Sequence, residues 1–156
     1  MVRLLRSCTG MLLVWMLVTA HAHANMGADE SESSNPNYQE GKKALAAQDW
    51  KKAIGLLTQA VQSEPGNSDA HSLLGYAYRK SGNLDASFAQ YGEALKLDPS
   101  NRHAHEYVGE AYLMVDNLPK AEQHLAELQR LCSPIPCEEL KELKRAVDAY
   151  KAAKKK

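Results

Sequence analysis

The sequence predicts an all-α protein built from a repeated pair of helices. Glycines recur at an interval of 34 residues, at Gly41, Gly75 and Gly109, and a fixed period of this length is typical of repeat arrays. Apolar residues within each interval are three or four positions apart, which is the spacing of one face of an α-helix. Aromatic residues make up only 6% of the chain, with a single Phe, which disfavours an aromatic-rich β-sandwich.

Length and charge limit the class of protein. The chain has 156 residues, which fits one compact domain, and its 19 Lys and Arg balance 19 Asp and Glu. Domains that bind nucleic acid are usually strongly basic, so no nucleic-acid partner is expected. A mean hydropathy of −0.47 excludes a protein with many membrane-spanning segments.

Residues 1–24 have the features of a signal peptide. Arg3 and Arg6 precede an apolar run at 11–20, and Ala22-His23-Ala24 fits a cleavage site of small residues, with Ala20-His21-Ala22 as a second candidate. The run is too short to span a bilayer, which needs about 20 residues, although an uncleaved anchor is the alternative. The sequence therefore predicts an exported protein, periplasmic or secreted, with no stable membrane span after cleavage and a flexible acidic leader at 25–34.

The first helical pair is expected within residues 34–67. Asn35 is placed to cap the first helix, with Pro36 at its first position, where the missing N–H is not needed. Asp49 is placed to cap a second helix over 50–63.

The second pair is expected within residues 68–101. A helix over 70–80 is broken by Ser81-Gly82-Asn83, and a second helix over 84–97 is stopped by Asp98-Pro99. Both helices have apolar residues along one side.

The third pair is expected within residues 102–135, with Asn117 capping its second helix. A final amphipathic helix is predicted over 138–152. The basic tail at 153–156 suits a helix C-terminus, where the dipole favours positive charge. Contact of this tail with a membrane surface is the alternative.

These units resemble the tetratricopeptide repeat (TPR), whose pattern is W-x2-L-G-x2-Y, then A-x3-F, then an Ala and a closing Pro. The opening Trp is replaced in all three units, and the third unit has Ser133 where Pro is expected. The resemblance implies a right-handed α-solenoid of three TPR units over 35–152, closed by a C-terminal capping helix. The middle unit has His71, Leu74, Gly75, Tyr78, Ser87, Tyr91, Ala94 and Pro99 at the pattern positions.

The resemblance assigns packing roles to the residues at these positions. Each glycine is expected to face the second helix of its own unit, the small residues opposite allow close approach, and the tyrosines fill the space between units. The structural set is Gly41, Gly75, Gly109, Ala53, Ala121, Ala60, Ala94, Tyr78, Tyr112, Pro65 and Pro99.

Histidines and cysteines are the candidate ligands of a metal. His103 and His105 point to different faces of one helix and cannot share an ion there, and His124 is expected on an outer helix face. Cys132 and Cys137 enclose four residues, and a disulfide between them would hold the last helix in place. A redox-active pair and unpaired thiols are the alternatives. No metal site and no cofactor are predicted.

The chain contains no recognised catalytic motif. G-x-S-x-G, H-E-x-x-H, the P-loop and G-x-G-x-x-G are all absent from the sequence. Carboxylates such as Glu139 and Glu142 alternate with lysines and are expected on a solvated helix face. The predicted function is therefore not enzymatic.

The TPR resemblance implies that the first helices of the units line a concave groove that binds a protein or peptide, and we expect a role in cell-envelope assembly. The basic residues with which one TPR class clamps a terminal carboxylate are mostly missing, so that activity is not expected. Thiol or metal handling by the cysteine pair and self-association of the repeats remain alternatives. The groove residues implied by the family are Tyr38, Lys42, Tyr76, Arg79, His103, Glu106, Tyr107 and Glu110.

Overall fold

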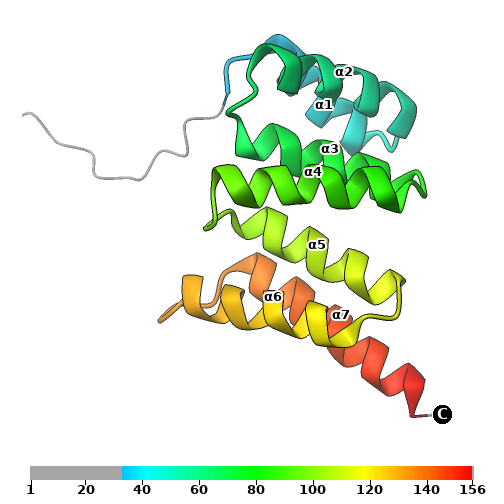
Figure 1. The fold of residues 1–156 in the computed structure, drawn as a ribbon, viewed down its shortest axis with the longest axis vertical. Coiled ribbons are helices and arrows are strands. Elements are labelled where there is room, and N and C mark those ends of the chain that lie inside the picture. Colours follow the sequence, from blue (N-terminus) through cyan, green and yellow to red (C-terminus); the bar gives the residue numbers. More distant parts are fainter. Residues whose placement is uncertain (1–32, 156) are drawn as a thin grey trace, which may run out of the picture. The chain divides into compact units, whose positions relative to one another are not determined.

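The computed structural model describes residues 33–155, and all regular secondary structure in this part is α-helical, as predicted (Figure 1). The signal peptide predicted at 1–24 and residues 25–32 of the leader lie outside the described residues. The helices are α1 (Pro36–Ala46), α2 (Trp50–Ser63), α3 (Ser68–Lys80), α4 (Leu84–Leu97), α5 (Arg102–Met114), α6 (Leu118–Leu131) and α7 (Glu138–Lys154).

An Asn or Asp side chain caps the start of each of the first six helices. Such a side chain accepts a hydrogen bond from a backbone N–H that has no partner within the helix. The capping residues are Asn35, Asp49, Asn67, Asn83, Asn101 and Asn117. Helix α7 has no such cap, and it continues to Lys154, so part of the predicted basic tail is helical.

The first helices of the pairs form an inner layer. Helix α3 packs on α1, α5 packs on α3, and α7 packs on α5, whereas α2, α4 and α6 make no contact with one another within residues 33–155. Figure 1 shows the pairs stacked in chain order. Because only the first helices touch their counterparts, the array bends toward them, and their exposed side chains line the inner face.

Glycines permit close helix approach within the first two units. A Cβ atom at Gly41 would lie 2.8 Å from Leu57 of α2, and one at Gly75 would lie 2.6 Å from the Tyr91 ring of α4. The prediction for Gly109 was wrong, because a Cβ there would lie 2.6 Å from Leu143 of α7 and not against α6. Leu143 follows Gly109 by 34 residues, where a fourth unit would have its glycine, and its side chain fills the space beside α5.

Two tyrosines lie between adjacent units. Tyr78 of α3 packs against the buried cluster that α1, α2 and α3 form between the first and second units. Tyr112 of α5 packs on the second unit, with its ring centroid 4.9 Å from that of Phe88. The alanines at the pattern positions are fully buried: Ala53, Ala60, Ala94 and Ala121.

The end of the predicted leader is attached to the first unit. The Ser33 hydroxyl donates a hydrogen bond to the Glu64 carboxylate at 2.7 Å, and the Gln39 side-chain amide donates to the Ser33 carbonyl at 2.8 Å. Ser33, which falls within the leader predicted at 25–34, is thus attached to the first unit. Within residues 33–155, none of the helices has both the length and the apolar character that a bilayer crossing requires.

Candidate binding groove

A row of aromatic rings crosses the inner face. The Trp50 and Tyr76 rings meet edge to face with centroids 6.2 Å apart, and the Tyr76 and Tyr107 centroids are 4.8 Å apart. The His103 ring stacks on Tyr107 at 5.9 Å. Because these rings come from α2, α3 and α5, the row joins all three units into one surface.

A pocket of about 290 Å³ opens beside this row, between α1, α3 and α5. Most of its wall is apolar or aromatic, and Lys42 is its one charged lining residue. Its volume fits one large apolar side chain of a partner better than a complete small-molecule ligand. The lining residues are Lys42, Leu45, Ala46, Leu73, Tyr76 and Tyr107.

Two lysines lie close to aromatic rings on the side of the groove formed by α1 and α3. The Lys80 ammonium lies 5.8 Å from the Trp50 ring centroid and 5.9 Å from that of Tyr76. The Lys42 ammonium lies 5.6 Å from the Tyr38 ring centroid. Cations at such distances are attracted to the faces of aromatic rings, so this half of the groove is aromatic and basic.

Two of the predicted groove residues are buried instead. Tyr38 is 6% exposed and belongs to the core of the first unit, and Arg79 is 8% exposed. The Arg79 guanidinium pairs with the Glu110 carboxylate at 2.5 Å and lies 5.3 Å from the Tyr76 ring centroid. It also lies 6.0 Å from the Tyr107 ring, so Arg79 holds both rings in position from beneath the surface.

Helix α7 brings two glutamates, Glu139 and Glu142, to the neighbourhood of α5. Glu139 is only 7% exposed, so the prediction that it lies on a solvated face was wrong. The reason is that α7 runs along α5, which brings the Glu139 carboxylate within 3.7 Å of Arg102 and 3.6 Å of His103. Glu142, on the same helix, is half-buried and pairs with Arg145.

Glu106 lies on α5, close enough to the glutamates of α7 to feel their charge. Burial raises its pKa to about 8, and the neighbouring carboxylates of Glu110, Glu139 and Glu142 contribute to the rise, against a smaller opposite effect of Arg79. No Lys or Arg among residues 33–155 lies within ion-pair distance of Glu106. Glu106 is therefore half-buried and mainly protonated at neutral pH, and it precedes Tyr107 of the pocket wall on α5.

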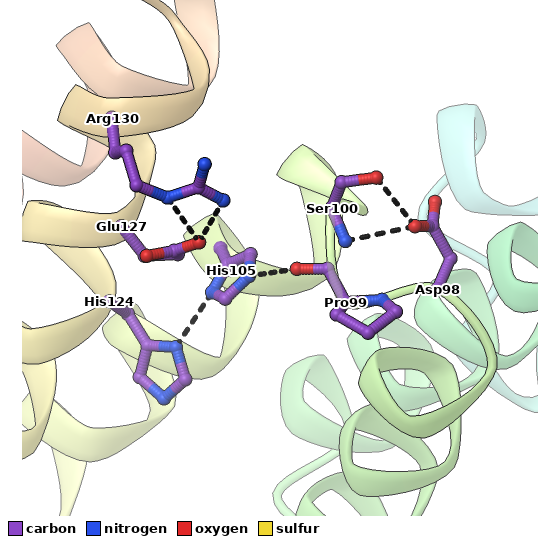
Figure 2. Close-up of polar contacts among 7 residues, drawn as sticks. All are labelled: Asp98, Pro99, Ser100, His105, His124, Glu127 and Arg130. Atoms are coloured by element: carbon purple, nitrogen blue, oxygen red, sulfur yellow. Dashed lines mark hydrogen bonds and ion pairs between the residues drawn. The ribbon is translucent and has the colours of Figure 1, made fainter.

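A histidine pair connects the third unit to the second (Figure 2). His105 Nε2 lies 3.0 Å from the Pro99 carbonyl, and His105 Nδ1 lies 2.9 Å from His124 Nδ1. Since a carbonyl only accepts, His105 carries its proton on Nε2, and His124 donates to the His105 Nδ1 lone pair. His124 was predicted on an outer face; it is instead turned inward, and its ring stacks on Tyr112 at 5.7 Å. Burial, and then His105, lowers the pKa of His124 to about 4.

The second unit has the same kind of joint, in which a histidine lies against the carbonyl of the proline that ends the preceding unit, but the second partner of the histidine differs. His71 Nε2 lies 3.2 Å from the Pro65 carbonyl, and its Nδ1 lies 2.8 Å from Oε1 of the Gln90 side-chain amide. Because an amide replaces the second imidazole there, the shared geometry is that of a hydrogen-bonded joint and not of a metal site. Pro65 and Pro99 thus contribute their carbonyls to these joints as well as ending a unit.

The cysteines join the third unit to the last helix. Cys132 and Cys137 form a disulfide, with Cα atoms 5.4 Å apart, between the end of α6 and the start of α7. Their sulfurs and the Glu139 carboxylate lie within 4.8 Å of one another, a spacing that could hold a metal ion. Thiolates are the ligands of metals, so the disulfide-bonded form cannot use these sulfurs in that way.

Four groove residues are absent from the set predicted from the sequence: Leu45, Ala46 and Leu73 of the pocket wall, and Trp50 of the aromatic row. Trp50 begins a second helix, and second helices were expected on the outside of the array. It reaches the inner face because it directly follows the turn from α1. A Trp at the first position of a second helix was the signal that could have identified it.

Family comparisons agree with the repeat geometry. A model described as TPR repeat matches residues 75–116, and one described as tetratricopeptide repeat matches residues 44–87. The chain belongs to the tetratricopeptide repeat family. No curated protein sequence matches this TPR chain.

Solved structures share the TPR fold. The type III secretion translocator chaperone SycD of Yersinia enterocolitica superposes with a TM-score of 0.68 at 18% identity, over 77% of this chain and 84% of that chain. The Sgt2 TPR domain of Aspergillus fumigatus gives 0.67 at 24% identity, over 76% and 77%. The TPR2B domain of yeast Sti1, in a complex with pHsp70, gives 0.67 at 21% identity, over 77% and 95%. The repeats support a role as a protein-interaction scaffold.

Proposed function

We propose that this TPR protein is a non-catalytic module that binds a peptide or protein segment in the groove formed by α1, α3 and α5. The observation that carries the proposal is the aromatic pocket of about 290 Å³ between these helices. Tyr and Trp are enriched among the residues that dominate binding energy at protein interfaces. The Tyr76 and Tyr107 rings are already held by Arg79, so little conformational freedom would be lost on binding.

Two structures of similar fold are solved with a segment of a partner protein or a peptide bound. PcrH is in complex with the chaperone-binding region of PopD, with a TM-score of 0.66 at 17% identity. The first TPR of Spaghetti is bound to the HSP90 peptide SRMEEVD, with a TM-score of 0.63 at 20% identity. These likenesses concern the fold, and they support a peptide as the class of ligand.

We further propose that the protein acts outside the cytoplasm, in assembly of the cell envelope. The signal-peptide features of residues 1–24 support export, and a disulfide between Cys132 and Cys137 suits an oxidising compartment. Cell fractionation with mass measurement of the native N-terminus tests export. An intact N-terminus on a cytoplasmic protein would contradict this part of the proposal.

A second candidate function is binding of a thiophilic divalent metal after reduction of the disulfide. It is favoured by the proximity of Cys132, Cys137 and Glu139. Zinc titration of reduced and oxidised protein tests it, and equal, weak binding by both forms would exclude it.

The groove is tested by selecting binders from a random peptide library. The protein is compared with Tyr76→Ala and with Gln123→Ala, an exposed residue of α6 outside the groove, after circular dichroism has shown that both variants are folded. We expect Tyr76→Ala to weaken the selected peptides by about tenfold or more, and Gln123→Ala to leave them unchanged. Absence of selected peptides, or equal binding by Tyr76→Ala, would contradict the proposal.

A further inference from the structure

The two halves of the groove differ in their ionisable side chains, with lysines in one half and carboxyl groups in the other. Lys42 and Lys80 stand beside the aromatic pocket on the side of α1 and α3. The Tyr76 and Tyr107 rings lie between the two halves. Carboxyl groups close enough to influence one another's charge gather on the side of α5 and α7: Glu106, Glu110, Glu139 and Glu142.

Most of the acidic charge is already balanced within the protein. Glu106 differs from its three neighbours, since no basic side chain among residues 33–155 pairs with it. The neighbours are paired as follows: Glu110 with Arg79, Glu139 with Arg102 and His103, and Glu142 with Arg145. Glu106 is therefore the carboxyl group that an incoming cation would satisfy.

The protonation of Glu106 follows from this isolation. Burial, together with three nearby carboxylates, raises its pKa to about 8, so the group is mainly neutral at pH 7. A Lys or Arg side chain placed against it would favour the carboxylate and release the proton. Binding of such a side chain should then strengthen as the pH rises from about 7 to about 9, where a lysine remains charged.

We propose that the groove binds an extended peptide of mixed charge, with an acidic residue over Lys42 and Lys80, a large apolar side chain in the aromatic pocket, and a Lys or Arg against Glu106. This inference rests on the proposed function and specifies the class of ligand. A purely acidic peptide would suit the lysines but would place like charge beside Glu106 and its neighbours. A purely basic peptide would suit Glu106 but would place like charge beside Lys42 and Lys80.

The probes are fluorescent synthetic peptides with one Trp or Leu anchor and different flanking charges. One has acidic residues before the anchor and basic residues after it, and a second has the opposite order, since chain direction is part of the question. The other two have only acidic or only basic flanks. We expect one of the mixed peptides to bind at least about tenfold more tightly than both uniform ones, with the advantage shrinking at high salt.

Charge variants locate the basic residue of the peptide. Glu106→Gln should abolish the advantage of the better mixed peptide and its rise in affinity with pH. Glu106→Lys should reverse the preference, so that a peptide with an acidic residue in place of its basic one binds better. Glu93→Gln is the matched control, because Glu93 lies on α4 and pairs with Lys96 at 3.0 Å, away from the groove.

The outcomes separate this inference from the proposed function. If no peptide binds the wild-type protein, both are overturned. In a second outcome, peptides bind the wild type and bind Tyr76→Ala more weakly, but their affinity does not depend on flanking charge or on Glu106→Gln. The groove function then stands, and the mixed-charge ligand is overturned. Tightest binding of the purely acidic peptide would also overturn the mixed-charge ligand.

Discussion

Acidification should loosen the joint between the second and third units. His124 donates a hydrogen bond to His105, and the N–H on His105 Nε2 is directed at the Pro99 carbonyl (Figure 2). A further proton would place a positive charge in a largely buried pair. Lys120 and His105 oppose that charge, and Glu127 favours it more weakly.

The size of the effect follows from the pKa of His124. Its pKa is about 4 in the folded protein and 6.5 in an unperturbed histidine, so the unfolded chain binds the proton first as the pH falls. Stability is therefore present above pH 6.5 and is lost between about pH 6.5 and 4. The full shift corresponds to about 2 kcal/mol between about pH 7.5 and pH 5. Solvent reaches part of the His124 ring and screens its charge, so we expect the free energy of unfolding to fall by about 1 kcal/mol over this pH range.

The second unit supplies the matched control. Gln90 occupies the position of His124 in the joint of His71. The side-chain NH2 group of a glutamine can donate to His105 Nδ1, so His124→Gln should keep a hydrogen bond while removing the titrating group. Urea unfolding followed by circular dichroism at about pH 7.5 and pH 5 gives the free energy of unfolding of both proteins. The pKa of Glu106 is raised to about 8, so this residue increases the free energy of unfolding as the pH falls. It does so equally in the wild type and in His124→Gln. The readout is thus the difference between them, and equal pH dependence would refute the reasoning.

Two further predictions concern packing and the disulfide. Gly75→Ala should lower the free energy of unfolding by about 2 kcal/mol, since its Cβ would lie 2.6 Å from the fully buried Tyr91 ring, as measured by urea unfolding. Gly92→Ala, in open space on the same hairpin, should raise it by about 0.5–1 kcal/mol, and equal effects would contradict the packing argument. Reduction of the Cys132–Cys137 bond should lower stability by about 2 kcal/mol, measured as a fall in melting temperature. The melting temperature of Cys132→Ser should not depend on reductant. If reductant also leaves the melting temperature of the wild type unchanged, the disulfide does not stabilise the fold as expected.

Local features of the sequence were sufficient to predict the helices. Asn35, Asp49 and Asn117 cap helices where they were expected to do so, because a cap depends only on the residue and on the N–H groups two or three positions later. The 34-residue interval likewise predicted which helices pair, since each unit buries its apolar face against the next.

The candidate site was only partly predictable, because its residues are brought together by helices that are distant in sequence. Arg79 was expected at the surface of the groove, but the ion pair with Glu110 of the next unit allows it to be buried. The alternation of charges around Glu139 is typical of a solvated face, and only the position of α7 along α5 explains its burial. The raised pKa of Glu106 depends on the same packing.

The sequence by itself determined the repeat, the helices and the TPR family, since periodic apolar residues, caps and glycines act over a few residues or over one repeat. Tertiary structure alone decided that α7 covers α5, that Gly109 meets Leu143, and that His124 faces His105. These features depend on how far one helix slides and turns against another, and burial, which sets both exposure and pKa, depends on that placement. A pattern along one chain specifies which side of a helix is buried, but not which charged groups the neighbouring helix brings to it.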